Sequence, residues 1–291
     1  MRRGWQAYRK ALLDGRGAEG LVEEEGRRAL RVQLTNDIRK TERYLRIVLA
    51  GHTPPPSEMS AARRAAASMI PPLKTWAGDF LAGISWSGSF AKSTALAGNT
   101  DVDLFVSLHY RTPGTLADIN SHLDSSLQAI GYVTQPRNVS IRVWPAGIAT
   151  DIVVGRRQTP LSHDHSLYSR RRKTWLKTNI VEHVRCVRDS PHRDVVKLVK
   201  IWSKCHGLDW PSFYLEMATL EALSGLRVNL LSRRLLLALS AFANELTAQR
   251  VLDPANSNNV VSDDLTQKEK TAIANAARSS LQQVYWKDIV W

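Results

Sequence analysis

The chain has 291 residues, of which 43% are hydrophobic, and its formal net charge is +13. That length suffices for two domains with packed cores. Because no long uninterrupted apolar run and no signal-peptide segment is present, we expect a cytoplasmic protein with no membrane contact. The two cysteines, Cys186 and Cys205, are too few for a disulfide framework or a zinc-ligand pattern.

The positive charge indicates a polyanionic partner, such as a nucleic acid, a nucleotide or an acidic surface. Solubility alone is an alternative explanation for the same excess. The basic residues are scattered in short groups, for example Arg63-Arg64 and Arg233-Arg234, and none is long enough to form a nucleic-acid-binding arm. We therefore expect nucleotides as partners, with a further nucleic-acid contact by the basic surface.

The N-terminal part of the chain is predicted to be helical. Residues 5–50 carry apolar side chains at helical spacing among charged ones. Three consecutive prolines, Pro54 to Pro56, break this pattern. Ser57 is expected to cap a second helix, which runs to Met69 and ends at Pro71-Pro72.

Strands follow in the middle of the chain. The strand at 81–86 leads through a small-residue turn into a short helix at 90–95. The next strand, at 101–108, is apolar after its first three positions, which is typical of a central strand buried on both faces. A helix at 116–130 and two strands at 139–144 and 148–154 come next.

From about Thr174 onward the pattern predicts helices alone. A strand-rich first half and a helical second half indicate an α+β fold or two domains, and we place the boundary near Arg185. The predicted helices of the second half cover residues 179–187, 195–206, 212–224, 229–249 and 266–286.

Two carboxylates mark the head of the strand at 101–108. Asp101 and Asp103 are two residues apart, so they share one face of the strand. Close carboxylates repel each other unless a cation lies between them, and Mg²⁺ favours carboxylates combined with substrate phosphates. Asp151, which precedes the apolar run 152–154, is the expected third ligand. In the alternative interpretation Asp101 is a turn residue and Asp103 a surface carboxylate.

Gly88 and Ser89 lie between a strand and a short helix. Backbone N–H groups at such a helix start can bind a phosphate. Gly88 would allow the phosphate to approach closely, and the Ser89 hydroxyl would add a donor or a ligand. Together with the carboxylates, this turn predicts a metal–triphosphate site, in which two metal ions activate a hydroxyl and stabilise the leaving pyrophosphate.

The pattern Gly88-Ser89…Thr94…Asp101-x-Asp103, followed by Asp151, resembles the polymerase-β-type nucleotidyltransferase superfamily. Within it, the segments LVKIWSKCHGLDWPSFYLE (198–216) and DPANSNNV (253–260) and the region of Trp286 and Trp291 resemble the CD-NTases. These are bacterial relatives of cyclic GMP–AMP synthase and oligoadenylate synthase. The resemblance covers about residues 57–291.

The resemblance implies an α+β fold with a polymerase-β-type core, which is a small mixed sheet with helices, and a helical C-terminal domain. The expected molecule is bilobed, with its active site in the cleft. The catalytic domain with the N-terminal helices would span residues 1–185, and the helical domain would span residues 186–291.

The resemblance also implies roles for individual residues. Asp101, Asp103 and Asp151 would be the catalytic residues and would hold two Mg²⁺ ions, for which Mn²⁺ can substitute. Five residues would bind the nucleotide: Gly88 and Ser89 at the triphosphate, Lys200 and Ser212 at phosphates, and Phe213 stacked on a base. Lys204 competes with Lys200 for its role, and Tyr214 competes with Phe213. Ser212 as a helix cap and Phe213 as a core residue are the structural alternatives.

The function implied is an enzyme that condenses nucleoside triphosphates (ATP, GTP or pyrimidine nucleotides) into a cyclic di- or trinucleotide second messenger. We expect a monomer that acts in antiphage (CBASS-type) signalling through a downstream effector reached by its product. Two alternatives stay open. One is a template-independent terminal nucleotidyltransferase of the CCA-adding or poly(A) kind, and the other is a non-catalytic relative that binds nucleotides or nucleic acid.

Overall fold

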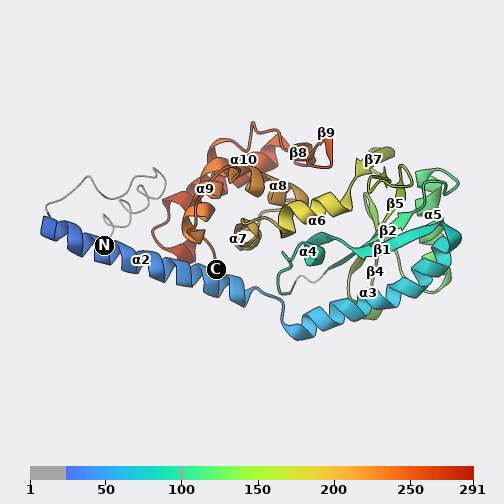
Figure 1. Cartoon of the computed structure of the whole chain (residues 1–291), viewed down its shortest axis with the longest axis horizontal. Coiled ribbons are helices and arrows are strands. Elements are labelled where there is room, and N and C mark those ends of the chain that lie inside the picture. The colour runs from blue at the N-terminus through green and yellow to red at the C-terminus, as the bar shows by residue number, and fades with distance from the viewer. Residues whose placement is uncertain (1–23, 99–100) are drawn as a thin grey trace. The chain divides into compact units, whose positions relative to one another are not determined.

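The structure, a computed structural model, describes residues 24–98 and 101–291 (Figure 1). The part of the predicted N-terminal helices before residue 24 lies outside the described residues. The described chain forms two compact units, each assembled from separate stretches. Unit 1 contains residues 24–52, 191–252 and 259–291, and unit 2 contains residues 53–190 and 253–258. The chain passes from unit 2 to unit 1 after Ser190, and residues 24–52 belong to unit 1 together with the C-terminal helices.

Unit 2 is built on a seven-stranded mixed sheet. Its spatial order is β1 (Leu81–Trp86), β2 (Val102–Leu108), β5 (Thr150–Arg157), β4 (Ser140–Val143) and β3 (Gln135–Pro136). The pairing of β2 with β5 is parallel, and the other pairings are antiparallel. The predicted central strand is confirmed, since β2 lies between β1 and β5 and is buried along nearly its whole length.

Three strands of this sheet were not predicted, namely the two-residue β3 and two longer strands that follow β5. β6 (His165–Ser169) pairs with β5, and β7 (Thr174–Thr178) pairs with β6, so the prediction that strands stop near Thr174 is wrong. The buried positions at the ends of these strands are polar, namely His165, Ser169 and Thr178. Leu167 is the one apolar residue among the buried positions of these two strands, so the sequence lacks the alternation that identifies a half-buried strand.

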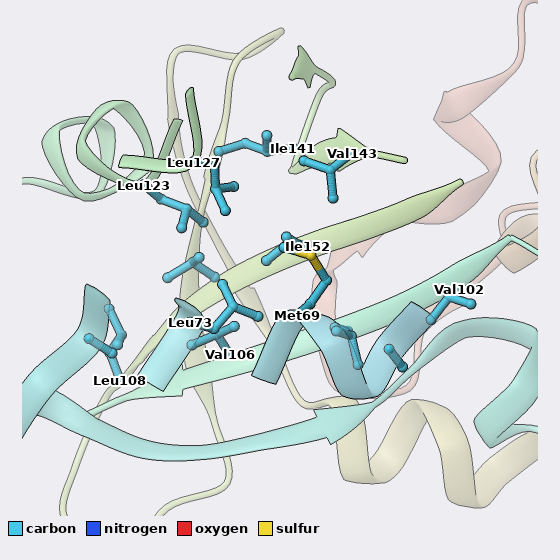
Figure 2. Close-up of a cluster of buried hydrophobic side chains, with 14 of the residues drawn as sticks. Met69, Leu73, Val102, Val106, Leu108, Leu123, Leu127, Ile141, Val143 and Ile152 are labelled. Carbon is cyan, nitrogen blue, oxygen red and sulfur yellow. The ribbon is translucent and has the colours of Figure 1, made fainter. Parts of the chain in front are cut away.

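Helices α3 (Pro56–Ala77) and α5 (Leu116–Ala129) supply the core of unit 2 on one side of the sheet. Figure 2 shows Met69 and Leu73 of α3 and Leu123 and Leu127 of α5 among the strand residues Val102, Val106, Ile141 and Ile152. Thr115 and Asp118 form a capping box that fixes the start of α5.

Helix α3 departs from its prediction at both ends. It begins at Pro56, with Ser57 inside its first turn, and it continues through Pro71 and Pro72 to Ala77. An interior proline costs about 3 kcal/mol. Leu73 and Ala77 are buried in the core beyond these prolines, and one fully buried Leu contributes roughly 1.5–3 kcal/mol. Core packing therefore offsets part of the cost of continuing the helix through two prolines.

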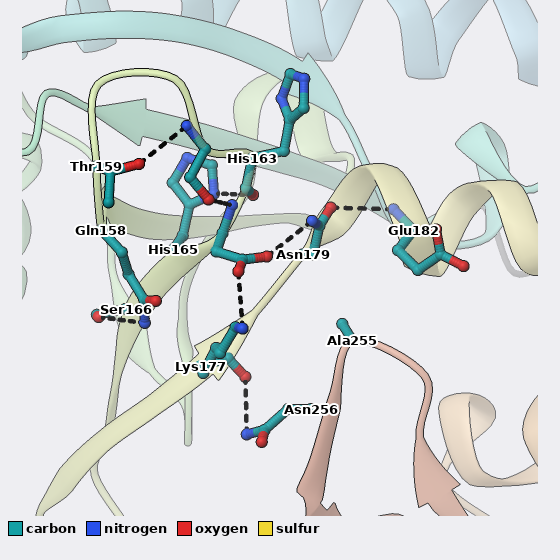
Figure 3. A network of polar contacts seen from close by, with 12 residues as sticks. Gln158, Thr159, His163, His165, Ser166, Lys177, Asn179, Glu182, Ala255 and Asn256 are labelled. Atoms are coloured by element: carbon teal, nitrogen blue, oxygen red, sulfur yellow. Dashed lines mark hydrogen bonds and ion pairs between the residues drawn. The ribbon is translucent and has the colours of Figure 1, made fainter.

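Short elements connect the sheet to its surroundings. β1 leads into the single turn α4 (Gly88–Ala91), which replaces the helix predicted at 90–95. The β5–β6 loop is tied to α6 (Ile180–Arg188) and to β7, because Asp164 accepts a hydrogen bond from Asn179 at 2.9 Å and pairs with Lys177 at 2.7 Å (Figure 3). Asn179 in turn caps α6 by accepting from the backbone N–H of Glu182. The short helices of this unit are η1 (Gly78–Phe80) and η2 (Pro145–Gly147).

Unit 1 is helical, as predicted for the second half of the chain. Its helices are α2 (Glu24–Gly51), α7 (Arg193–Cys205), α8 (Ser212–Ala222), α9 (Leu231–Asn244) and α10 (Gln267–Gln282), with η3 (Val261–Asp264) and η4 (Trp286–Asp288). The carboxylate of Glu42 in α2 caps α9 by accepting from the N–H groups of Leu231 and Ser232. β8 (Leu252–Asp253) and β9 (Asn256–Val260) form a separate two-stranded sheet. No helix in the described ranges is both long and apolar enough to cross a membrane.

Candidate active site

The register of β2 and β5 brings two of the predicted carboxylates together. Asp103 and Asp151 are direct partners in this parallel pairing, and neighbouring strands lie about 4.8 Å apart. Val102 and Leu104, on either side of Asp103, belong to the buried core. Because side chains alternate along a strand, Asp103 lies on the opposite face of the sheet, together with Asp151.

The predicted glycine turn lies directly against Asp103. The N–H of Ser87 donates to the carbonyl of Asp103 at 2.8 Å. Gly88 has a φ of +60°, and a Cβ built on it would lie 1.7 Å from Oδ2 of Asp103. A side chain at position 88 is therefore disfavoured by the backbone conformation and would force the side chain of Asp103 to move. Ser89 follows, half-buried, in α4.

Arg142 joins Asp151 to Asp101. Its Nε donates to Oδ1 of Asp151 at 3.1 Å, and its Nη2 donates to Oδ2 of Asp151 at 2.6 Å and to Oδ2 of Asp101 at 2.7 Å. Arg142 comes from β4, where it is the register partner of Asp151. The hydrogen bonds to Asp151 raise the pKa of Arg142, so the guanidinium keeps its charge. Ser140 Oγ adds a bond to Oδ1 of Asp151 at 3.3 Å.

Asp103 is in surroundings that oppose its negative charge. Burial raises its pKa to about 6, and the neighbouring charges of Asp151 and Asp101 act in the same direction. Lys92 and Arg142 lower the pKa but do not cancel the increase. A carboxylate held this way favours the arrival of a further positive charge.

The positive charge that lies beside these carboxylates in the structure is that of Arg142. Among residues 24–98 and 101–291, no group of three His, Cys, Asp or Glu side chains is arranged to hold a metal ion. A single guanidinium nitrogen lies instead at 2.6–2.7 Å from both Asp101 and Asp151. Arg142 therefore occupies the space between two carboxylates that the sequence assigns to Mg²⁺.

Lys200 and Ser212 belong to unit 1. Lys200 is only 9% exposed, and its Nζ lies 2.6 Å from Oε1 of the buried Glu216. The alternative of a solvated lysine on an amphipathic helix is therefore wrong for Lys200, whereas Lys204 fits that description, being exposed one turn later. Ser212 is exposed at the start of α8, and no side-chain hydrogen bond caps that helix.

Phe213 and Tyr214 were the two candidates for stacking on a nucleotide base. Tyr214 is fully buried, with its ring edge-on to Trp210 at a centroid distance of 5.5 Å, and burial raises its pKa to about 12. Phe213 is only partly buried. Of these two rings, Phe213 is the one with surface to offer a base.

Arg142 and Lys92 were missed from the sequence. Arg142 stands in the predicted strand 139–144, and the core residues Ile141 and Val143 place it on the face opposite the core. That alternation was a usable signal, but it required knowing that β4 pairs with the strand of Asp151. Nothing in the sequence indicated Lys92, because its effect on the pKa of Asp103 depends on how the chain turns after α4.

No protein-family model matches the chain, and no curated protein matches it either. Solved structures do resemble it. CdnC of E. coli MS115-1, solved with ATP, has a TM-score of 0.68 and 21% identity, and the match covers 84% of this chain and 90% of CdnC. The CD-NTase CdnG of Bradyrhizobium diazoefficiens, solved in complex with GTP, has a TM-score of 0.70 and 13% identity, and the match covers 82% and 90%.

A third similar structure is that of a polymerase. The Cid1 poly(U) polymerase, an H336N mutant bound to MgATP, has a TM-score of 0.63 and 14% identity, and the match covers 84% of this chain and 94% of Cid1. The predicted resemblance to the CD-NTases and the predicted α+β class are thus confirmed at the level of the fold. This chain has the nucleotidyltransferase fold that the CD-NTases CdnC and CdnG share with Cid1.

Proposed function

We propose that the protein is a Mg²⁺-dependent nucleotidyltransferase that condenses nucleoside triphosphates into a cyclic di- or trinucleotide. The observation that carries this proposal is the meeting of carboxylates and glycine turn in unit 2. Asp103 and Asp151 are register partners, and Gly88 lies so close to Asp103 that a Cβ would not fit between them. The first N–H groups of a helical turn have no partner within that turn and suit a phosphate.

The residues present fit Mg²⁺ by their chemistry. Carboxylate oxygens are the ligands that this hard cation prefers, and Asp101, Asp103 and Asp151 would hold it. The raised pKa of Asp103 reflects negative charge that a cation would compensate. Bound there, Mg²⁺ would supply charge neutralisation for the triphosphate and activation of the attacking hydroxyl.

The side chains of unit 2 divide the remaining work. Gly88 and Ser89 bind the triphosphate of the donor nucleotide and orient its α-phosphate. Asp151 orients the 3′- or 2′-hydroxyl of the acceptor nucleotide and withdraws its proton. Attack on the α-phosphate expels pyrophosphate, and a second attack within the linear product closes the ring. Catalysis rests mainly on positioning and charge compensation.

Three further residues are assigned nucleotide contacts by resemblance. Lys200 and Ser212 would bind phosphates, and Phe213 would stack on a base, an interaction of about 1–3 kcal/mol that tolerates any base. Lys200 must then exchange part of its interaction with Glu216 for a phosphate. The partial exposure of Phe213 supports its role.

The comparisons support a product of the CD-NTase kind. CdnC was solved with ATP and CdnG with GTP, which are nucleotides that a cyclic-nucleotide synthase would join. In the cell, the cyclic product would act as the second messenger of a CBASS-type antiphage system and would activate a separate effector. The enzyme would act as a cytoplasmic monomer.

Extension of an RNA end is the second candidate function. The net charge of +13 and the similarity to Cid1, a poly(U) polymerase, favour it. It uses the same carboxylates and differs only in the acceptor, which would be an RNA 3′ end instead of a second nucleotide.

Pyrophosphate release tests the site that both candidates share. The full chain is incubated with four nucleoside triphosphates and Mg²⁺, with and without an RNA oligonucleotide. We expect release by the wild type and by the surface control Asp79→Asn, and none by the Asp101→Asn, Asp103→Asn double variant. Undiminished release by that double variant would show that the metal-site assignment is wrong.

A further inference from the structure

Arg142 is held between two carboxylates by the backbone of its own sheet. It is the register partner of Asp151, and its guanidinium binds both oxygens of that carboxylate as a fork. The same Nη2 atom that binds Asp151 at 2.6 Å also binds Asp101 at 2.7 Å. The side chain of Arg142 is only 15% exposed. These contacts make Arg142 a built-in countercharge for two of the three carboxylates.

The oxygens that Arg142 binds are those that the proposed function assigns to Mg²⁺. Sharing an oxygen between a guanidinium and a divalent cation would bring like charges within a few ångströms of each other, which is costly in a half-buried site. Ser140 takes up further acceptor capacity on Oδ1 of Asp151. Arg142 and a metal ion are therefore competitors for Asp101 and Asp151.

We propose that Arg142 is a positioning residue that makes metal binding depend on the nucleotide. It holds Asp101 and Asp151 together before substrate arrives, opposes the binding of divalent cations alone, and moves to phosphate oxygens when metal and nucleotide enter together. A guanidinium binds phosphate with the same forked geometry as carboxylate. The triphosphate thus offers Arg142 a replacement partner, and metal and nucleotide favour each other's binding through this side chain. This inference rests on the proposed function.

Arg137 provides a matched control. Its Nε lies 3.9 Å from Oδ1 of the same Asp151, and its side chain is 45% exposed. Its guanidinium donates to Gln135 at 3.3 Å. Replacing Arg137 removes the same charge from the surroundings of Asp151 without removing one of the short hydrogen bonds that hold the carboxylate.

The test measures the affinity of the full chain for Mn²⁺. Electron paramagnetic resonance reports the concentration of free Mn²⁺, and each titration is done with and without a non-hydrolysable nucleoside triphosphate analogue. Arg142→Gln should bind Mn²⁺ alone at least about tenfold more tightly than the wild type, because close charge pairs are strongly coupled. It should also gain less affinity from the analogue. Arg137→Gln should stay within about threefold of the wild type, as expected for an exposed charge.

Arg142→Lys keeps the charge but cannot bind two oxygens as a fork, so its affinity for Mn²⁺ alone should lie between those of the wild type and Arg142→Gln. If thermal melts show that Arg142→Gln is unfolded, Arg142→Lys carries the test, with at least about threefold tighter binding expected.

Two results would overturn the inference about Arg142 while leaving the proposed metal site intact. One is Mn²⁺ binding by the wild type with the analogue but no tightening in the Arg142 variants, and the other is equal tightening in Arg137→Gln. A lack of Mn²⁺ binding by every protein, with and without the analogue, would overturn the proposed metal site and this inference with it.

Discussion

Gly88 packs so closely against the side chain of Asp103 that no room is left for a Cβ at residue 88. A Cβ at residue 88 would lie 1.7 Å from Oδ2 and 2.3 Å from Cγ of Asp103. We predict that Gly88→Ala lowers nucleotidyl transfer by at least about 100-fold, since small displacements of positioned groups have effects of that size. It should also cost about 1–3 kcal/mol of unfolding free energy, because residue 88 has a positive φ. Urea unfolding and pyrophosphate release measure the two effects.

Gly83→Ala is the control for this prediction. Gly83 lies in β1, and a Cβ there would meet no atom within 4 Å. Its activity and stability should stay near those of the wild type. Full activity in a folded Gly88→Ala protein would mean that the turn does not need to approach Asp103 for catalysis.

The raised pKa of Asp103 predicts how stability depends on pH. Burial and the charges of Asp151 and Asp101 raise this pKa from 3.8 to about 6. The folded state therefore binds this proton more tightly than the unfolded state, and stability falls as pH rises between these values. Asp103→Asn removes the charge, and at pH 8 without metal it should gain on the order of 1–3 kcal/mol, since each pKa unit corresponds to about 1.4 kcal/mol.

Thermal melts of the metal-free protein from about pH 4 to pH 8 check this prediction. The stability difference between Asp103→Asn and the wild type should grow with pH and level off above the raised pKa. Asp79→Asn serves as the surface control. A difference that does not change with pH would contradict the account of Asp103.

His165 predicts the opposite pH dependence in the same unit. It is 5% exposed, its Nε2 lies 2.8 Å from Ser107 Oγ, and its Nδ1 lies 2.7 Å from the carbonyl of His163. Burial lowers the pKa of His165 below its ordinary value of 6.5. The unfolded chain then binds this proton more readily, so stability present above that value is lost as pH falls through it.

The measurement is urea unfolding at pH 7.5 and at pH 5.5. His165→Gln should be less stable than the wild type at pH 7.5 and should lose less stability on acidification. His163→Gln, altered in the exposed neighbouring histidine, should behave like the wild type. Equal acid sensitivity of His165→Gln and the wild type would show that His165 does not contribute.

Variants of the buried pair Lys200–Glu216 can distinguish a structural role of Lys200 from a nucleotide-binding role. Removing one partner of a buried pair costs about 3–5 kcal/mol, whereas replacing both by apolar residues is often nearly neutral. We predict that Glu216→Leu is strongly destabilised and that the double variant Lys200→Met, Glu216→Leu recovers much of the loss. The double variant should still bind nucleoside triphosphate more weakly than the exposed-lysine control Lys204→Met, as titration calorimetry would show. Unaltered nucleotide affinity in the folded double variant would remove Lys200 from the proposed site.

The sequence predicted the parts of the fold in which burial and hydrophobicity coincide. The all-apolar run of β2 identified a central strand, and the spacing of Asp101 and Asp103 placed both at its head. β6 and β7 were missed because polar residues such as His165 and Thr178 are buried in them. The continuation of α3 through Pro71 was missed because it depends on the tertiary packing of Leu73.

The positions of the three carboxylates relative to the strands could be inferred from the sequence, but the positive charges around them could not. The sequence indicated three carboxylates that need a cation. It did not indicate that β4 would pair with β5 so that Arg142 faces Asp151. Strand register links residues far apart in the chain, and a single sequence carries little information about it.

One product analysis tests the central proposal most directly. The full chain is incubated with four labelled nucleoside triphosphates and Mg²⁺, without RNA, then treated with phosphatase and examined by mass spectrometry, with each nucleotide omitted in turn. We predict a phosphatase-resistant cyclic di- or trinucleotide that is absent from the Asp101→Asn, Asp103→Asn variant. Transfer of nucleotides only to an added RNA 3′ end, with no phosphatase-resistant product in its absence, would contradict the proposal of a cyclic-nucleotide synthase.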